Sequence, residues 1–383
     1  MASYWERYLE KWIGAGLIDD STAGRIRSYE AIHQRKDGLR WPVLLAIGLG
    51  GLLLCAGVLL FVAAHWDTLS PSLRFALVVG LVAVFHLTAA LMAERFPALA
   101  TTFHAVGTVC LGAGIFLAGQ IFHLQEHWPG GVMLWALGAW LAWALLSDWT
   151  HVGLVAILTP FWLGGEWYEA TRGMNVSGKI LSQGLLLLSI SYLTAVVPGK
   201  ETAARKVLMW IGGLCLIPLA GWVPQEFVDT QRQAPLSAGY LALGWISALA
   251  LPLGLSLWLR GRNAWMNGLA AIWVVLLGLP KFNPGLYGYK HFSLWDEVGT
   301  YLIWALGSLL MIAWGLKDAR KERVNLGIAG FALTVFSFYF SSIMDKLDRA
   351  LSLITLGLLF VLGGWLLEKT RRRLVARIEK DRT

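Results

Sequence analysis

Residues 107–140 read GTVCLGAGIFLAGQIFHLQEHWPGGVMLWALGAW, and this stretch decides how the rest of the chain is interpreted. It is an apolar, glycine-rich run that ends in a polar cluster between Gln120 and His127 and then resumes as a second apolar run. Apolar runs of this length are typical of membrane-spanning helices. We therefore expect a helix up to the polar cluster, a turn at residues 129–131 and a second helix beyond the turn.

The composition of the whole chain agrees with a membrane location. Of the 383 residues, 57% are hydrophobic and only 15% are charged. Soluble domains have a little under half apolar residues and about a quarter charged ones. The chain is therefore predicted to be an integral membrane protein, with the lipid bilayer as its main partner. Its basic residues are interleaved with acids and flank apolar runs, so no nucleic-acid partner is expected.

Twelve apolar runs alternate with short polar breaks along the chain. Each run approaches the roughly 20 residues that a helix needs to cross about 30 Å of hydrocarbon. Backbone groups must be paired within the bilayer and no alternating barrel pattern is present, so the predicted fold is all-α, a polytopic helical bundle with about 12 transmembrane helices. The expected spans are 43–65, 73–93, 101–123, 131–147, 150–166, 180–197, 206–223, 236–259, 264–280, 298–316, 324–343 and 350–367.

The bundle at residues 41–367 is expected to have a polar segment at each end. Residues 1–40 predict a short cytoplasmic helical hairpin, with helices at 3–13 and 20–35. Residues 368–383 predict a basic cytoplasmic tail. With twelve spans both termini lie on one side, and that side holds 24 of the 32 lysines and arginines. The bias predicts that both termini are cytoplasmic.

Polar residues gather at the outer ends of two spans. His65 and Asp67 end the first span, while Gln120, His123, Glu126 and His127 end the third. Because both spans run in the same direction, these side chains are delivered to a similar depth and form one candidate polar site. The alternative is that Asp67 caps a turn and the histidines are wetted interface residues.

His123, Glu126 and His127 spell the pattern H-x-x-E-H. On a helix, residues four apart share a face, so His123 and His127 could bind one zinc ion while Glu126 acts as general base. A third ligand would come from elsewhere, with His65, Asp67, Glu166 and Glu169 as candidates. The alternative is a chance match of a short motif, and no other cofactor is predicted.

Two histidines fall inside the predicted spans. His86 lies in the second span and His104 near the inner end of the third. Ionisable groups at such depth are costly unless they face a partner or water, and histidine can exchange a proton near neutral pH. The alternative is a neutral histidine that hydrogen-bonds to a neighbouring helix. Glycines in the first and third spans also allow close contact, so these two spans are expected to be central.

Several motifs in the first part of the chain resemble a known family. They are Gly16-Leu17-Ile18, the run from Gly57 to His65-Trp66-Asp67, the run Gly119 to Leu124, Trp128-Pro129 and Leu134-Trp135-Ala136-Leu137. Over residues 1–147 the chain resembles a family of predicted bacterial membrane proteins known as domain of unknown function 2157. The resemblance implies the bacterial inner membrane and gives no reaction. The family commonly has asparagine where this chain has His65, and Glu126 and His127 lie outside the matching motifs.

Three function classes remain open from the sequence. A transporter or channel-like subunit predicts a cavity that reaches mid-membrane beside His86, Gln120 or His123. A structural or assembly subunit, with a membrane-protein partner or a second copy of itself, predicts a filled core. A membrane-embedded enzyme predicts bound metal or a carboxylate with histidine at the outer face. We favour the first class, and whether the chain is an enzyme stays open. It has no nucleotide-binding loop of the G-x-x-x-x-G-K-S/T type.

Overall fold

A computed structural model describes residues 4–37, 70–121, 127–225, 234–279 and 294–343, single positions between 46 and 60, and residues 354, 357–365, 368–369 and 371–373. The described residues are helical apart from loops and two isolated bridges, and they contain no named strand. This confirms the all-α membrane fold in its coarse form. The chain divides into two compact units, Met1–Cys110 and Leu111–Thr383, and the boundary lies within helix α5.

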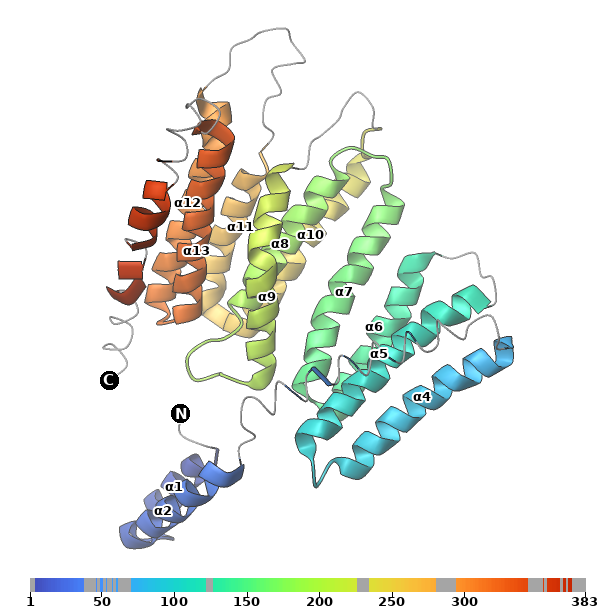
Figure 1. The fold of residues 1–383 in the computed structure, drawn as a ribbon, viewed down its shortest axis with the longest axis vertical. Helices are drawn as coiled ribbons and strands as arrows, with labels where there is room; N and C mark the ends of the chain where they lie inside the picture. The colour runs from blue at the N-terminus through green and yellow to red at the C-terminus, as the bar shows by residue number, and fades with distance from the viewer. Residues whose placement is uncertain are drawn as a thin grey trace. The chain divides into compact units, whose positions relative to one another are not determined.

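The first unit contains a short helix pair and the start of a membrane hairpin (Figure 1). Helices α1 (Tyr4–Gly14) and α2 (Asp20–Asp37) contact each other, and Leu9 and Ala23 are buried. Their placement at the cytoplasmic membrane surface stays a prediction. Helices α4 (Pro71–Met92) and α5 (Pro97–Ile121) follow, and Phe85 and Val106 are among the residues packed between them.

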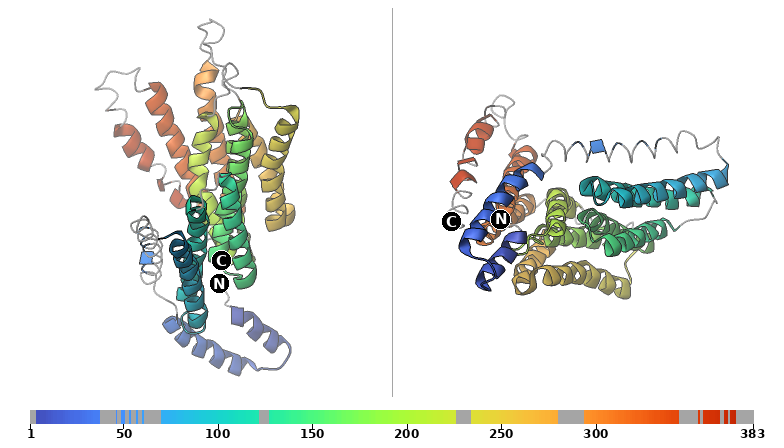
Figure 2. Two further views of the ribbon diagram at one scale, coloured as in Figure 1. Left: turned by 90° about the vertical axis from the view of Figure 1, so that its right-hand side faces the viewer. Right: turned by 90° about the horizontal axis from the view of Figure 1, so that it is seen from below.

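The second unit is a bundle of helices that pack mostly on their neighbours in sequence (Figures 1 and 2). Closely paired helices include α6 with α7, α8 with α9 and with α10, and α12 with α13. The helices are α6 (Trp128–Leu146), α7 (Trp149–Ala170), α8 (Ser177–Leu193), α9 (Ala203–Trp222), α10 (Ala238–Arg260), α11 (Trp265–Leu277), α12 (Leu294–Lys317) and α13 (Lys321–Phe338), which continues as a π-helix, η5 (Tyr339–Ile343).

Seven of the described helical segments are long and apolar enough to cross a membrane. They are Pro71–Met92, Pro97–Gly119, Trp128–Leu146, Ala203–Trp222, Ala238–Leu277, Val298–Lys317 and Lys321–Ser341. The predicted span 43–65 lies largely outside the described residues. Of the predicted span 350–367, the structure describes residue 354 and residues 357–365, which include a π-helix, η7 (Leu359–Gly363). The predicted spans 236–259 and 264–280 fall in the one segment Ala238–Leu277, and α8 has only 17 residues. The structure thus supports a multi-pass membrane protein without confirming the count of twelve.

Helix starts follow from capping side chains. Ser70, Asp148, Thr202 and Ser237 each precede a helix and accept a hydrogen bond from a backbone N–H of its first turn. Such caps satisfy donors that have no partner within the helix. The expected turn at residues 129–131 is wrong, because Pro129 occupies the first turn of α6. Proline is favoured there, since that N–H would have no helical partner anyway.

Helix α8 is the most deeply buried helix of the second unit. Leu186, Leu187 and Ile190 lie in the hydrophobic core of the second unit. Hydroxyl groups of α8 also form hydrogen bonds to the neighbouring helices. Ser189 donates to Gly212 O of α9 over 2.9 Å, and Ser191 donates to Pro252 O of α10 over 3.0 Å. A Cβ at Gly212 would lie 2.3 Å from backbone atoms of α8, so glycine is required for this contact. Small residues and hydroxyls at helix contacts are typical of membrane bundles.

Candidate functional site

The two histidines predicted within the membrane contact each other. His86 of α4 and His104 of α5 lie with their Nδ1 atoms 2.9 Å apart and their ring centroids 5.2 Å apart. One ring must donate the proton and the other accept it. Gly107, one turn beyond His104, makes room for this pair, because a Cβ there would lie 2.7 Å from the His86 ring. The packing of α4 against α5 thus accommodates the contact between the two histidines.

Most of the predicted outer cluster lies outside the described residues. This applies to His65, Asp67, His123 and Glu126, and to the side chain of Gln120, whose backbone belongs to α5. The grouping of the first and third spans around these residues therefore stays a prediction.

His127 is the one described member of that cluster, and it contacts α7. Its Nε2 atom lies 2.6 Å from Glu166 Oε2, and Glu166 Oε1 accepts a hydrogen bond of 3.0 Å from Trp162. Beside it, Trp128 donates to Glu169 Oε1 over 2.7 Å. The side chains of His127 and Glu166 are 57% and 38% exposed, so this histidine–carboxylate pair is open to its surroundings.

His127 precedes α6 and is not part of a helix. Its backbone angles are φ −71° and ψ 87°, which lie outside the helical region. The expectation that His123 and His127 lie one turn apart on one helix is therefore not met at His127. Among the described residues, no group of three histidine, cysteine or acidic side chains could hold a metal ion.

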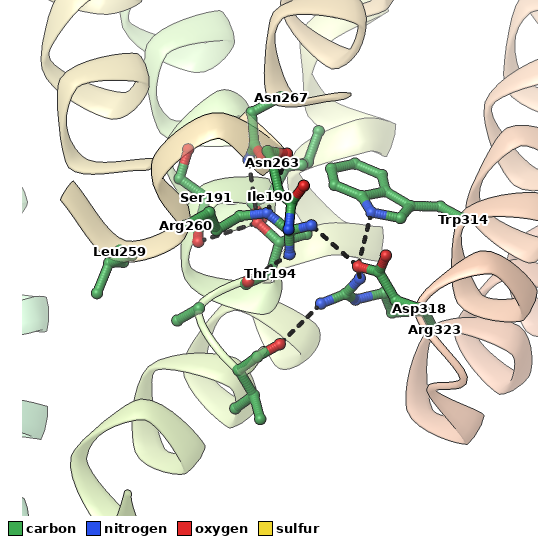
Figure 3. A network of polar contacts seen from close by, with 12 residues as sticks. Ile190, Ser191, Thr194, Leu259, Arg260, Asn263, Asn267, Trp314, Asp318 and Arg323 are labelled. Carbon is green, nitrogen blue, oxygen red and sulfur yellow. Dashed lines mark hydrogen bonds and ion pairs between the residues drawn. The ribbon is translucent and has the colours of Figure 1, made fainter. Parts of the chain in front are cut away.

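A larger polar network joins the ends of α8, α10, α12 and α13 (Figure 3). At its centre Asp318 Oδ2 accepts from Arg260 over 2.9 Å, from Trp314 Nε1 over 3.1 Å and from Arg323. The guanidinium groups also donate to backbone carbonyls: Arg260 to Thr194 O over 2.8 Å, and Arg323 to Val196 O over 3.1 Å. Both arginines also lie against the Trp314 ring, at 5.3 and 5.4 Å from its centroid.

This network is deeply buried and carries an excess of positive charge. The Arg323 and Arg260 side chains are 2% and 1% exposed, and both share the single carboxylate of Asp318. Burial raises the pKa of Asp318, but the hydrogen bonds and charges of Arg260 and Arg323 lower it more, so the net pKa lies below its ordinary value. The carboxylate is therefore ionised at neutral pH and compensates two buried cations.

A cavity of about 450 Å³ lies among α9, α11, α12 and α13. We call it the indole-lined cavity, because Trp265, Trp273, Trp304 and Trp314 all contribute to its wall. Its volume falls within the range of about 300–1,000 Å³ that is usual for small-molecule sites. The expected position of a cavity was beside His86, Gln120 or His123, and the described lining of this one contains no histidine.

The Asp318 network and the position of the cavity were not predicted from the sequence. Arg260, Lys317 and Arg323 are three of the 24 lysines and arginines that the sequence assigns to the cytoplasmic side, although the structure buries Arg260 and Arg323. The contact between the two histidines could have been predicted from their positions. Arg95 lies in the turn of a predicted hairpin, and His86 and His104 lie nine residues before and after it. Antiparallel helices place such positions at one level.

The family model of the predicted membrane protein DUF2157 matches residues 10–151. This confirms the resemblance over that part of the chain, and the matched range also includes Glu126 and His127. No curated protein and no solved structure is significantly similar to the chain. The matched family and the apolar helices together identify a membrane protein in a lipid bilayer, with no reaction attached.

Proposed function

We propose that this protein is a transporter or channel-like subunit whose solute is apolar or amphiphilic and binds in the indole-lined cavity. The single observation that carries the proposal is the cavity itself, about 450 Å³ among helices of membrane-spanning length. The alternative of a structural subunit predicts a filled core, whereas this partly open space extends among the helices beside the core residues Leu216 and Trp314.

The chemistry of the wall supports an apolar or amphiphilic solute. Most of the lining comes from aliphatic and indole side chains of four helices, with Ser308, Thr334 and Ser337 as smaller polar members. Thr334 donates its hydroxyl hydrogen to Gly330 O over 2.8 Å, so it can offer a ligand only its acceptor lone pairs. A strongly hydrated solute would lose its water here without finding enough partners.

The test is a filling substitution at Ala270, which lines the cavity on α11. Ala270→Phe should abolish solute handling, whereas Ala250→Phe, at an exposed position on α10, should not. Cells that express each form would be compared by untargeted mass spectrometry of cells and medium, and a solute whose distribution changes would then be tested in proteoliposomes. No solute that depends on the wild type and is lost in Ala270→Phe would overturn the proposal.

A second candidate function rests on the contact between His127 and Glu166. We propose a membrane-embedded enzyme at this face as the alternative, since an imidazole 2.6 Å from a carboxylate can act as a general base. Metal content of protein purified without chelators would decide it, comparing wild type with His123→Ala and His127→Ala. Zinc bound near one per chain and lost in both variants supports this alternative, while a metal-free wild type removes its metal-dependent form.

A further inference from the structure

Lys317 stands at one end of the indole-lined cavity. It is the last residue of α12, and its Nζ lies 4.5 Å from the centroid of the Trp265 ring. It is the one ionisable side chain in the described lining. The residue itself is exposed, so its ammonium group can reach both the membrane surface and the cavity mouth.

The carboxylate beside Lys317 in the sequence is already engaged. Asp318 accepts from Arg260, Arg323 and Trp314, so it does not neutralise the lysine. Within the part of the chain that the structure describes, no carboxylate forms an ion pair with Lys317. This end of the cavity therefore presents a cation next to a network that itself holds two arginines for one acid.

The rest of the wall offers a ligand little besides apolar contact. Three indole N–H groups are used within the protein: Trp273 donates to Ile303 O (2.8 Å), Trp304 to Ala220 O (3.0 Å) and Trp314 to Asp318 (3.1 Å). These rings then contribute their apolar surface to the cavity. The part of a ligand that lies against these rings is therefore expected to be hydrophobic.

The lining is also long in one direction. Trp304 and Lys317 both line the cavity and lie 13 residues apart on α12. At 1.5 Å per residue this corresponds to about 20 Å along the helix. A long apolar space with a cation at one end matches an alkyl chain that carries an anionic head group.

We propose that the indole-lined cavity binds a single-chain anionic amphiphile, such as a long-chain carboxylate, with its head group at Lys317 and its alkyl chain extending towards Trp304. This inference rests on the proposed function, because it names the solute class of the same cavity. It adds one specific claim, which is that the Lys317 ammonium selects for negative charge.

The experiment uses two photoreactive probes that differ only in the head group: palmitate with a diazirine in its chain, and the corresponding neutral hexadecanol. The full-length protein would be placed in phosphatidylcholine nanodiscs at alkaline pH, where palmitate is ionised. After irradiation, labelled peptides from α11, α12 and α13 would be quantified by mass spectrometry. Wild type should label more strongly with palmitate than with hexadecanol at these helices.

Four variants distinguish the effect of the Lys317 charge from the effect of the free volume in the cavity. Lys317→Gln should lower palmitate labelling about fivefold and leave hexadecanol labelling unchanged, as expected for the loss of one lysine near a lipid surface. Lys317→Arg should retain the preference, and Lys200→Gln, an exposed cation outside the described lining, should have no effect. Ala270→Phe should reduce labelling by both probes, and Ala270→Leu replaces it if the larger side chain prevents folding.

The outcomes distinguish the two proposals. Suppose that Ala270→Phe abolishes labelling by both probes. If wild type then shows no preference for palmitate, or if Lys317→Gln retains that preference, the proposed selectivity for an anionic head group is wrong. The cavity remains a solute site in that case. If the Ala270 variants fold and leave labelling by both probes unchanged, the cavity does not bind these chains and both proposals fail.

Discussion

At the scale of single residues, the stability of the folded protein should depend strongly on Asp318. It compensates two buried guanidinium groups, of Arg260 and Arg323. Removing one partner from a buried ion pair leaves an uncompensated charge and costs about 3–5 kcal/mol. Asp318→Asn should therefore destabilise the folded protein by about that amount in denaturant unfolding in detergent.

The matched control for this prediction is Glu322→Gln. Glu322 lies in the first turn of α13, close in sequence to Asp318, and has no ion pair with another described residue. It should change stability by less than about 1 kcal/mol. Equal effects of the two substitutions would contradict the assigned role of Asp318.

The same carboxylate predicts a dependence on pH. Arg260 and Arg323 hold the pKa of Asp318 below its ordinary value in the folded protein despite burial. A lowered pKa stabilises the fold above the ordinary pKa of about 3.9, and this contribution is lost as the pH falls through the folded-state value. The stability difference between wild type and Asp318→Asn should therefore be constant near neutral pH and shrink in acid. A difference that grows as the pH falls would show that another group dominates.

At the scale of helices, the α4–α5 hairpin depends on a contact that can be measured. His86 and His104 share one hydrogen bond across the two helices, at 2.9 Å between their Nδ1 atoms. In a double-mutant cycle with His86→Phe and His104→Phe, the two substitutions should be coupled by about 0.5–1.5 kcal/mol, the usual range for interhelical hydrogen bonds in membranes. Additive effects in the unfolding free energy would mean that the two rings do not stabilise each other.

Hairpins are also the level at which sequence analysis worked best. Hydropathy located α4, α6, α9 and α12 to within a few residues, because each is a continuous apolar run between polar breaks. Residues that lie about equally far before and after the turn of a hairpin are expected to face each other. His86 with His104, and His127 with Glu166, are two such pairs that are in contact. The position of the turn thus predicts which residues of a hairpin lie at the same level.

Contacts between distant helices could not be obtained in this way. Arg260 and Asp318 are 58 residues apart, and Arg323 bonds to Val196 across 127 residues. Hydropathy assigns these arginines to loops, because it records polarity and no packing partner. For the same reason it cannot reveal that α9, α11, α12 and α13 leave a cavity among them. The polar cluster at His65, Asp67, Gln120, His123 and Glu126 stays a prediction, since those side chains lie outside the described residues.

At the scale of the whole molecule, the orientation in the membrane decides which side the Lys317 end of the cavity faces. The bias of lysine and arginine predicts that Arg172 lies outside and Lys200 in the cytoplasm. These two exposed residues lie beyond opposite ends of α8, whose 17 residues extend about 25 Å. They are therefore suitable positions for reporters on the two sides of one helix.

The corresponding test uses single cysteines in a background without Cys55, Cys110 and Cys215. Arg172→Cys should react with a membrane-impermeant thiol reagent in intact cells, and Lys200→Cys should react only after lysis. Because Lys317 is predicted on the same side as Lys200, this result would place the cationic end of the cavity at the cytoplasmic surface and direct the search for its solute to the inner leaflet. The reverse pattern would invert the topology and move that end outside, while labelling of both positions in intact cells would mean that α8 does not cross the membrane.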